Sequence, residues 1–207
     1  MLENYKWRYA TKKFDPTKKI SDHNLSILKE SIQLAPSSYG LQLFKVLIID
    51  SAEVRAKLKP FSWNQSQITD ASHLLVFCNY NRVTYDLIDE FVALKAKAQN
   101  IGIDQLEGYG SFIKNKLSEK SEEEVEAWTS KQTYLALGNL LNTAADLKID
   151  SCPMEGFEPA EYDKILNLSG QNLTASVVAT IGYRSEEDKN QFAPKVRRPM
   201  DFLFETI

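Results

Sequence analysis

Short apolar runs alternate with segments of helical periodicity along this chain. Residues 44–50 and 73–80 are continuous apolar runs, the pattern of strands buried on both faces. A strong strand is also expected over 174–183, and a shorter one near 149–153. Because helical segments separate the strands, the pattern predicts an α+β domain with a central sheet covered by helices.

Helical segments fill most of the sequence between the strands. A helix over about 22–35 can be capped by Ser21 or Asp22, and Pro36 helps to end it. Further helices are expected in a short segment before residue 8 and over 84–100, 105–118 and 159–167. No linker-like stretch or internal repeat interrupts the pattern, so residues 1–207 are interpreted as one domain.

The clearest helix starts after Ser121 and should run to about residue 147. Ser121 and Glu124 have the spacing of a capping box. The second half of this helix is apolar almost all round, which predicts that it is enclosed. Gly138 within it costs about 1 kcal/mol relative to alanine, a cost that a tight contact with another backbone would offset. The last two dozen residues have no periodic pattern and are expected to form an extended tail.

Composition is that of a water-soluble globular protein. Apolar residues make up 43% of the chain and charged residues 26%. No apolar run approaches the roughly 20 residues that a membrane span needs, and the first ten residues have no signal-peptide core. These features predict a cytoplasmic protein.

Charge is distributed unevenly. Residues 1–20 hold six basic and two acidic residues, a net +4, and residues 195–207 hold three and two, a net +1. The total charge is −3, so residues 21–194 carry −8. A nucleic-acid binder would show a broad basic face and a high pI, whereas the pI here is about 5.5. Two small basic clusters on an acidic body favour a small anionic ligand, with scattered surface lysines as the alternative.

The sequence lacks the residues that several common catalytic and binding sites require. His23 and His73 are the only histidines, no G-x-S-x-G is present, and no spacing suggests a metal site. The G-x-G at 108–110 lacks a third glycine, so a Rossmann site is not supported. Cys78 and Cys152 both lie in apolar surroundings and are interpreted as buried, reduced thiols.

Six segments are informative when their order and spacing are considered together. They are Arg8-Tyr9-Ala10-Thr11-Lys12 with Phe14-Asp15, Ala35 to Gln42, Asn64 with the D-A-S-H at 70–73, the helix at 130–141, P-M-E-G-F at 153–157, and P-K-V-R-R-P at 194–199. In this order and spacing, over essentially the whole chain, they resemble the FMN-dependent nitroreductase family. The resemblance implies a mixed, mostly antiparallel sheet in an interlocked homodimer whose C-terminal tail wraps around the partner. Two FMN molecules would lie at the subunit interface.

The resemblance also implies roles for individual residues. The FMN phosphate and ribityl chain would be held by Arg8, Lys12, Lys195 and Arg197. Asn64 would contact the ribityl or pyrimidine part of the flavin, and Glu155 and Gly156 would present backbone to the isoalloxazine ring. The remaining cofactor contacts would come from Tyr9, Ala10 and Pro153, from Gly40, and from Pro36, Ser37 and Ser38 of the partner subunit's loop. Tyr39, Tyr109 and Phe112 would border the substrate.

The implied activity is ping-pong hydride transfer from NAD(P)H to the flavin and then to a quinone, a nitroaromatic compound or a pterin-like acceptor. No catalytic side chain and no metal are required, because the cofactor carries the chemistry. Three alternatives stay open: a non-catalytic flavin-binding dimer, a same-fold enzyme of dehalogenation or flavin breakdown, and an unrelated anion-binding domain. Ala10, Gly40 and Gln67 depart from residues common in the family and would reshape the pocket. The sequence does not choose between NADH and NADPH.

Overall fold

Four strands form the centre of the computed structural model, which describes residues 1–207. They are β1 (Phe44–Ile49), β2 (His73–Tyr80), β3 (Asp150–Met154) and β4 (Leu173–Gly182), in the order β1-β2-β4-β3. Every neighbouring pair is antiparallel. The expected mixed sheet is therefore wrong for the strands of one chain. The parallel contact that does occur is an isolated bridge between Ala10 and Ser151, where the N-terminal segment runs beside β3.

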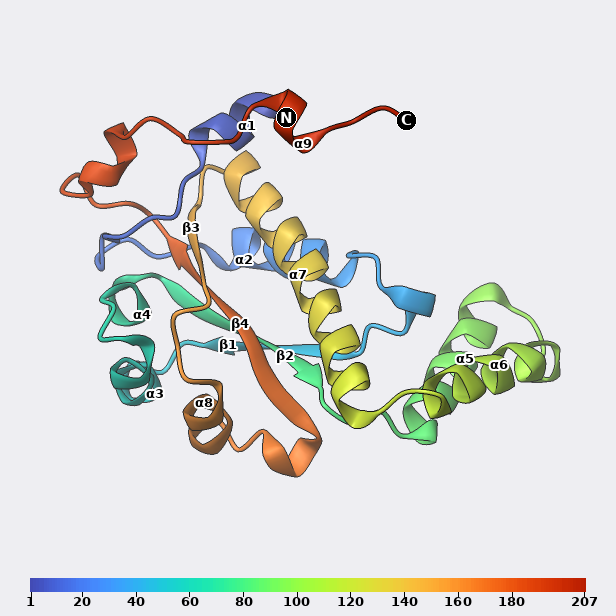
Figure 1. Ribbon diagram of the computed structural model, residues 1–207. Coiled ribbons are helices and arrows are strands. Elements are labelled where there is room, and N and C mark those ends of the chain that lie inside the picture. Colours follow the sequence, from blue (N-terminus) through green and yellow to red (C-terminus); the bar gives the residue numbers. More distant parts are fainter.

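Helices cover both faces of the sheet (Figure 1). On one face lie α2 (Asp22–Gln33) and the long α7 (Glu122–Asp146). The other face is covered by α3 (Ala52–Leu58), α4 (Gln67–Asp70) and α8 (Pro159–Ile165). The expected α+β architecture, a sheet between helices, is confirmed.

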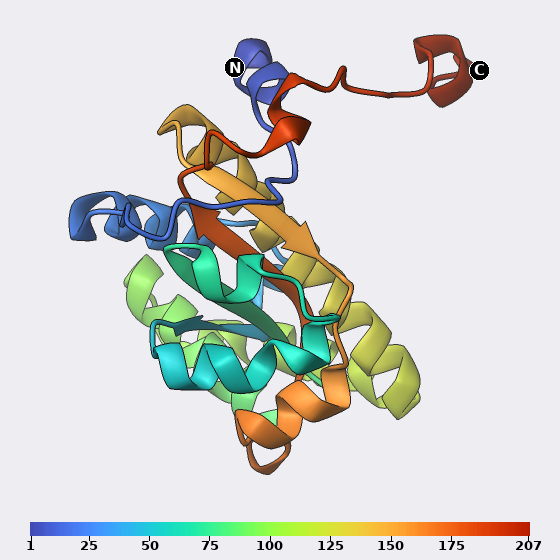
Figure 2. The same cartoon turned by 90° about the vertical axis from the view of Figure 1, so that its left-hand side faces the viewer.

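The helices α5 (Tyr85–Gln99) and α6 (Glu107–Ser118) pack together at one side of the molecule, around a small core of their own (Figure 1). The short helices α1 (Leu2–Trp7) and α9 (Met200–Leu203) lie near the two chain ends, which are both at the top of Figures 1 and 2. None of the helices is long and apolar enough to cross a lipid bilayer.

Burial of the strands follows their place in the sheet. In β2, Leu75 and Phe77 face α2 and α7, whereas Leu74 and Val76 face α3 and α4, so this strand is buried on both faces as predicted. The same prediction is wrong for β1, whose residues are mostly half-buried. The reason is that β1 is an edge strand, with a neighbour on one side alone.

The helix α7 begins and ends within one residue of its predicted limits, and the capping box of Ser121 and Glu124 is present. A single chain does not enclose it, so its predicted enclosure stays a prediction that depends on the expected dimer. Tyr134 is 42% exposed and Leu135 is 47% exposed, because no element of the same chain covers this side of the helix. A Cβ at Gly138 would meet nothing within 4 Å, so the expected backbone contact is absent from this chain.

The tail differs from the prediction in detail. It is extended over most of its length, but a 3₁₀ turn at Lys189–Phe192 and helix α9 interrupt it. The Asp188 side chain caps the first of these turns, and Pro199 precedes the second. All residues from 192 to 207 are exposed.

Candidate anion-binding site

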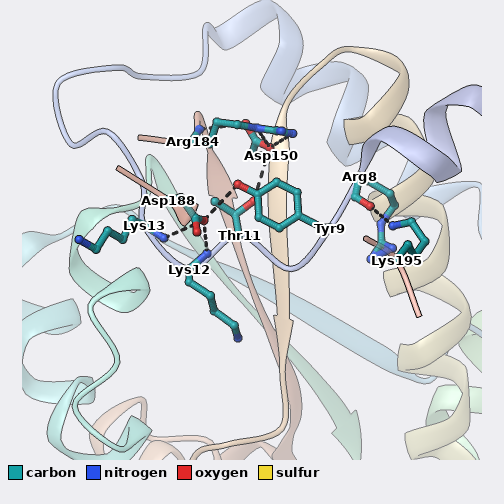
Figure 3. A network of polar contacts seen from close by, with 9 residues as sticks. All are labelled: Arg8, Tyr9, Thr11, Lys12, Lys13, Asp150, Arg184, Asp188 and Lys195. Carbon is teal, nitrogen blue, oxygen red and sulfur yellow. Dashed lines mark hydrogen bonds and ion pairs between the residues drawn. The ribbon is translucent and has the colours of Figure 1, made fainter. Parts of the chain in front are cut away.

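The two basic clusters lie at one end of the sheet, because the first cluster pairs with the segment that leads from β4 to the second cluster. The Asp15 N–H donates to the carbonyl of Tyr183 at 2.8 Å, and the Ser185 N–H donates to the carbonyl of Lys13 at 2.9 Å. The Lys195 ammonium also donates to the carbonyl of Arg8. Residues almost 190 positions apart in the sequence are thus brought into contact (Figure 3).

A cavity of about 360 Å³ lies between these segments. Six predicted cofactor contacts line it, namely Arg8, Tyr9, Ala10, Lys12, Lys195 and Arg197. We call it the cationic pocket. Lys13 and Arg198 do not line it: Lys13 pairs with Glu187 at 3.3 Å, and Arg198 lies 4.2 Å from the centre of the Phe202 ring.

The four cations of the pocket have no anionic partner. None of Arg8, Lys12, Lys195 and Arg197 has a carboxylate oxygen within 4.0 Å. Burial lowers the pKa of the Arg8 guanidinium, and the charge of Arg197 lowers it further. The pKa of Lys195 is lowered by burial and then by Arg8 and Arg197. The side chains therefore repel one another, and a bound anion would relieve that repulsion.

Arg8 supplies a direct test of whether an anion fits. Its Nε is buried and has no hydrogen-bond partner. A buried donor on a charged group is costly to leave unpaired, so such a group points to a missing acceptor. A phosphate could accept from the guanidinium and from the nearby lysines. The residues present thus fit a phosphate-bearing ligand such as FMN.

Cys152 of β3 borders the same region, with its Sγ 3.8 Å from the Lys12 Nζ. Both cysteines are buried and free, as predicted. Burial raises the pKa of Cys78 to about 12 and also raises the pKa of Cys152. Neither thiol is therefore a nucleophile near neutral pH.

We expect both thiols to be unreactive toward Ellman's reagent in the folded protein at pH 8, because burial blocks access and disfavours the thiolate. Two thiols per chain should react once the protein is unfolded in guanidinium chloride. Absorbance of the released thionitrobenzoate measures both states. Rapid native reaction of one thiol would show that the packing around β2 or β3 opens readily.

A second set of predicted residues surrounds the turn between β3 and α8. Pro153 and Glu155 line a hollow of about 460 Å³ beside α7. The Tyr134 hydroxyl donates to Oε1 of Glu155 at 2.6 Å. A Cβ at Gly156 would lie 2.8 Å from the ring of Trp63, so the close approach of this ring requires glycine.

Asn64 follows Trp63 in the same loop, where both residues have left-handed backbone conformations and exposed side chains. Gln65 ties this loop to the β3–α8 turn, since its Nε2 donates to the carbonyl of Gly156 at 3.0 Å. Asn64 is therefore close to the Glu155–Gly156 turn in space, although it does not line the cationic pocket.

The loop from Pro36 to Gly40 lies elsewhere, beside α5 and α6 (Figure 1). Tyr109 donates to the carbonyl of Tyr39 at 3.1 Å, and the Tyr39 ring lies 6.2 Å from the rings of Phe112 and Trp128. The Ser38 N–H donates to Oε1 of Gln132 in α7, and Gly40 approaches Phe91. A single chain does not bring this group, including Ser37, to the cationic pocket. Its assignment to the flavin and the substrate stays a prediction.

Sequence reasoning missed the acidic residues that support the pocket. Asp188 accepts hydrogen bonds from the backbone of Lys12 and Lys13. Asp150 pairs with Arg184, whose guanidinium lies between the rings of Trp7 and Tyr9 at 4.4 and 4.6 Å. Asp188 stands in the charged stretch R-S-E-E-D-K, which is typical of a solvated loop, so the sequence offers no signal for it.

An antiparallel sheet between two helical layers, with a cationic pocket between the N-terminal segment and the segment after β4, defines an α+β protein with a candidate anion-binding site. A sequence model described as "Nitroreductase family" matches residues 5–183. This chain belongs to the nitroreductase family.

Relatives over the full length agree with this assignment. The chain is 34% identical to a Staphylococcus haemolyticus protein, SH0546, over 100% of this chain and 97% of that protein. It is 37% identical to a Haemophilus influenzae protein over 97% of this chain and 93% of that one. Both carry names that place them among the NAD(P)H nitroreductases.

Two solved structures have the same fold. One is from Staphylococcus epidermidis and is described as an NAD(P)H:FMN oxidoreductase, with a TM-score of 0.89 and 21% identity over 100% of this chain and 95% of that one. The other is a nitroreductase from Exiguobacterium sibiricum in complex with FMN, with a TM-score of 0.85 and 20% identity over 100% of this chain and 96% of that one.

Proposed function

We propose that this protein is an FMN-dependent NAD(P)H oxidoreductase of the nitroreductase type. The observation that carries the proposal is the cationic pocket, in which four basic side chains line one cavity without a carboxylate and one buried guanidinium nitrogen lacks an acceptor. The names of the full-length relatives and the FMN complex of a protein with the same fold support the choice of ligand.

Arg8, Lys12, Lys195 and Arg197 would hold the FMN phosphate and ribityl chain. The Glu155–Gly156 turn would lie against the ring system, where the glycine already accepts the close approach of Trp63. When bound, FMN would supply the redox chemistry, accepting hydride from NAD(P)H and then reducing an acceptor. The residues of the chain orient the cofactor, and their positive charge favours negative charge developing on the ligand.

A homodimer is part of this proposal. The uncovered face of α7 exposes Tyr134 and Leu135 and leaves open space over Gly138. The exposed tail also carries large apolar side chains, among them Phe202 and Phe204. A second copy packed on α7 would cover both surfaces and would bring a Pro36–Gly40 loop toward the cationic pocket.

For the acceptor we propose a flat electron acceptor such as a quinone, a nitroaromatic compound or a pterin. Tyr39 and Phe112 are 37% and 48% exposed, and their rings meet edge to face beside the Tyr109 hydroxyl. An exposed aromatic group of this kind can stack on a planar ligand. Either NADH or NADPH could serve as the donor.

The first test is the visible absorption spectrum of the purified protein after incubation with FMN and gel filtration. We expect a retained flavin spectrum that bleaches on anaerobic addition of NADH or NADPH and returns when a quinone is added. Retained flavin without bleaching would favour a non-catalytic flavin-binding dimer. A protein that never retains FMN would overturn the proposal.

A further inference from the structure

The Asp188 carboxylate joins the two chain segments that form the cationic pocket. Its Oδ2 accepts from the N–H of Lys12 at 2.7 Å, the N–H of Lys13 at 3.1 Å and the hydroxyl of Tyr9 at 3.1 Å. Its Oδ1 accepts from both the backbone N–H and the side-chain amide of Asn190, each at 3.1 Å. Five hydrogen bonds thus converge on one side chain, and they come from both segments (Figure 3).

These contacts keep Asp188 ionised although the residue is only 1% exposed. Burial by itself raises the pKa of the Asp188 carboxyl, but the bonds from the Lys12, Lys13 and Asn190 backbone and from Tyr9 outweigh it, and the pKa lies below its usual value. A carboxylate that accepts several backbone N–H bonds behaves in this way.

Asp188 binds the backbone beside the cations and leaves their charged ends alone. It is absent from the lining of the pocket, and it forms no ion pair with Lys12, whose side chain extends away from it (Figure 3). The carboxylate of Asp188 therefore fixes the backbone without neutralising the basic side chains of the pocket. A salt bridge would have fixed the same loop at the cost of occupying a ligand-binding group.

The cations need such an anchor because they repel one another. Arg8 is half-buried, and the charge of Arg197 contributes to lowering the pKa of both Arg8 and Lys195. Without a fixed backbone, the two segments could separate and expose their side chains to water. The pocket would then have to reassemble whenever a ligand binds, which weakens binding.

We propose that Asp188 is a positioning residue for phosphate recognition, which holds the 8–13 and 190–197 segments together so that their cations stay converged before the ligand arrives. This inference rests on the proposed FMN function. It concerns the phosphate end of the ligand alone, since the hydrogen bonds of Asp188 go to Tyr9, Lys12, Lys13 and Asn190 and none goes to the Glu155–Gly156 turn.

The test compares FMN with riboflavin, which lacks the phosphate, by quenching of flavin fluorescence in full-length protein stripped of flavin. In Asp188→Asn one accepting oxygen becomes an NH₂ group that faces other donors. We expect FMN affinity to fall roughly tenfold or more and riboflavin affinity to change by less than about twofold. Glu187→Gln is the matched control, because it removes an adjacent exposed carboxylate and should leave both affinities unchanged.

Asp188→Glu provides a second variant that keeps the charge but lengthens the side chain in a buried site, and a smaller selective loss of FMN affinity is expected. Equal losses for FMN and riboflavin, or an unaltered FMN-to-riboflavin ratio in both variants, would overturn the positioning role. A wild-type protein that binds FMN no more tightly than riboflavin would instead refute the phosphate site itself, and with it this part of the proposed function.

Discussion

Replacement of Arg8 by alanine is expected to weaken FMN binding by about 100-fold while leaving riboflavin binding within a few-fold of the wild type. Charge-assisted hydrogen bonds contribute about 1.5–3 kcal/mol each, and a guanidinium can give two to one phosphate. Arg8 is half-buried, and its Nε has no acceptor in the chain, so its hydrogen-bonding capacity is available to a ligand.

The same substitution should not destabilise the flavin-free protein. The pKa of Arg8 is lowered first by burial and then by Arg197, so keeping this charge in the folded state is unfavourable. Removing it also relieves the repulsion that lowers the pKa of Lys195. The free energy of unfolding without flavin should therefore be unchanged or slightly higher, which is the usual relation between a strained site and stability.

Fluorescence titrations with FMN and riboflavin, together with urea unfolding of the flavin-free protein, check this prediction. Lys13→Ala is the control, since it makes the same change in net charge five residues further along the chain, at a side chain that lies outside the pocket. It should alter FMN affinity by less than about threefold. Equal effects of the two substitutions would mean that general positive charge, and not the pocket, attracts the ligand.

The sequence predicted the framework of the fold because hydrophobic periodicity reflects burial within one chain. The limits of α7 and the two-sided burial of β2 follow directly from their patterns. Order and spacing of short motifs also predicted the nitroreductase family, which the family match over residues 5–183 confirms. Convergence of Arg8 and Lys195 was expected through that resemblance alone, since no local pattern links residues so far apart.

Features that depend on long-range side-chain contacts could not be predicted. Asp188 bonds to residues about 175 positions away, and its charged neighbours suggest a solvated loop. The open face over Gly138 is not encoded in the periodicity, because an apolar surface has the same pattern whether its own chain or another covers it. The short helices α3 and α4 were not predicted, and the buried arginine that joins them has no sequence signal.

That arginine, Arg55, gives the prediction with the largest effect on stability. It is only 3% exposed, and its guanidinium donates to the carbonyls of Ile68 at 2.6 Å, Ala71 at 2.6 Å and Ser72 at 3.2 Å. Burial lowers the pKa of Arg55, while Asp50 and Asp70 partly oppose this. Arginine stays charged in proteins even so, and Arg55 closes the end of α4 with charge-assisted bonds.

Arg55→Met should lower the free energy of unfolding by roughly 3 kcal/mol, because three buried carbonyls lose their donor while the cost of burying the charge is also removed. Urea unfolding at one fixed protein concentration measures the change. Lys57→Met on the same helix removes an exposed pair with Glu53 and should cost less than about 1 kcal/mol. A similar small loss for Arg55→Met would show that water replaces the guanidinium.

Substitutions of Arg8 and Arg55 should have opposite effects on ligand selectivity and on stability, so the two variants distinguish a residue that binds the phosphate from one that stabilises the fold. Arg8→Ala is expected to change the FMN-to-riboflavin affinity ratio and not the stability of the flavin-free protein. Arg55→Met is expected to change stability and not that ratio, because Arg55 lies under α4 and does not line the cationic pocket. If Arg55→Met also changed the ratio, the phosphate site would depend on the packing beneath α4, and Asp188 would not be a sufficient anchor for it.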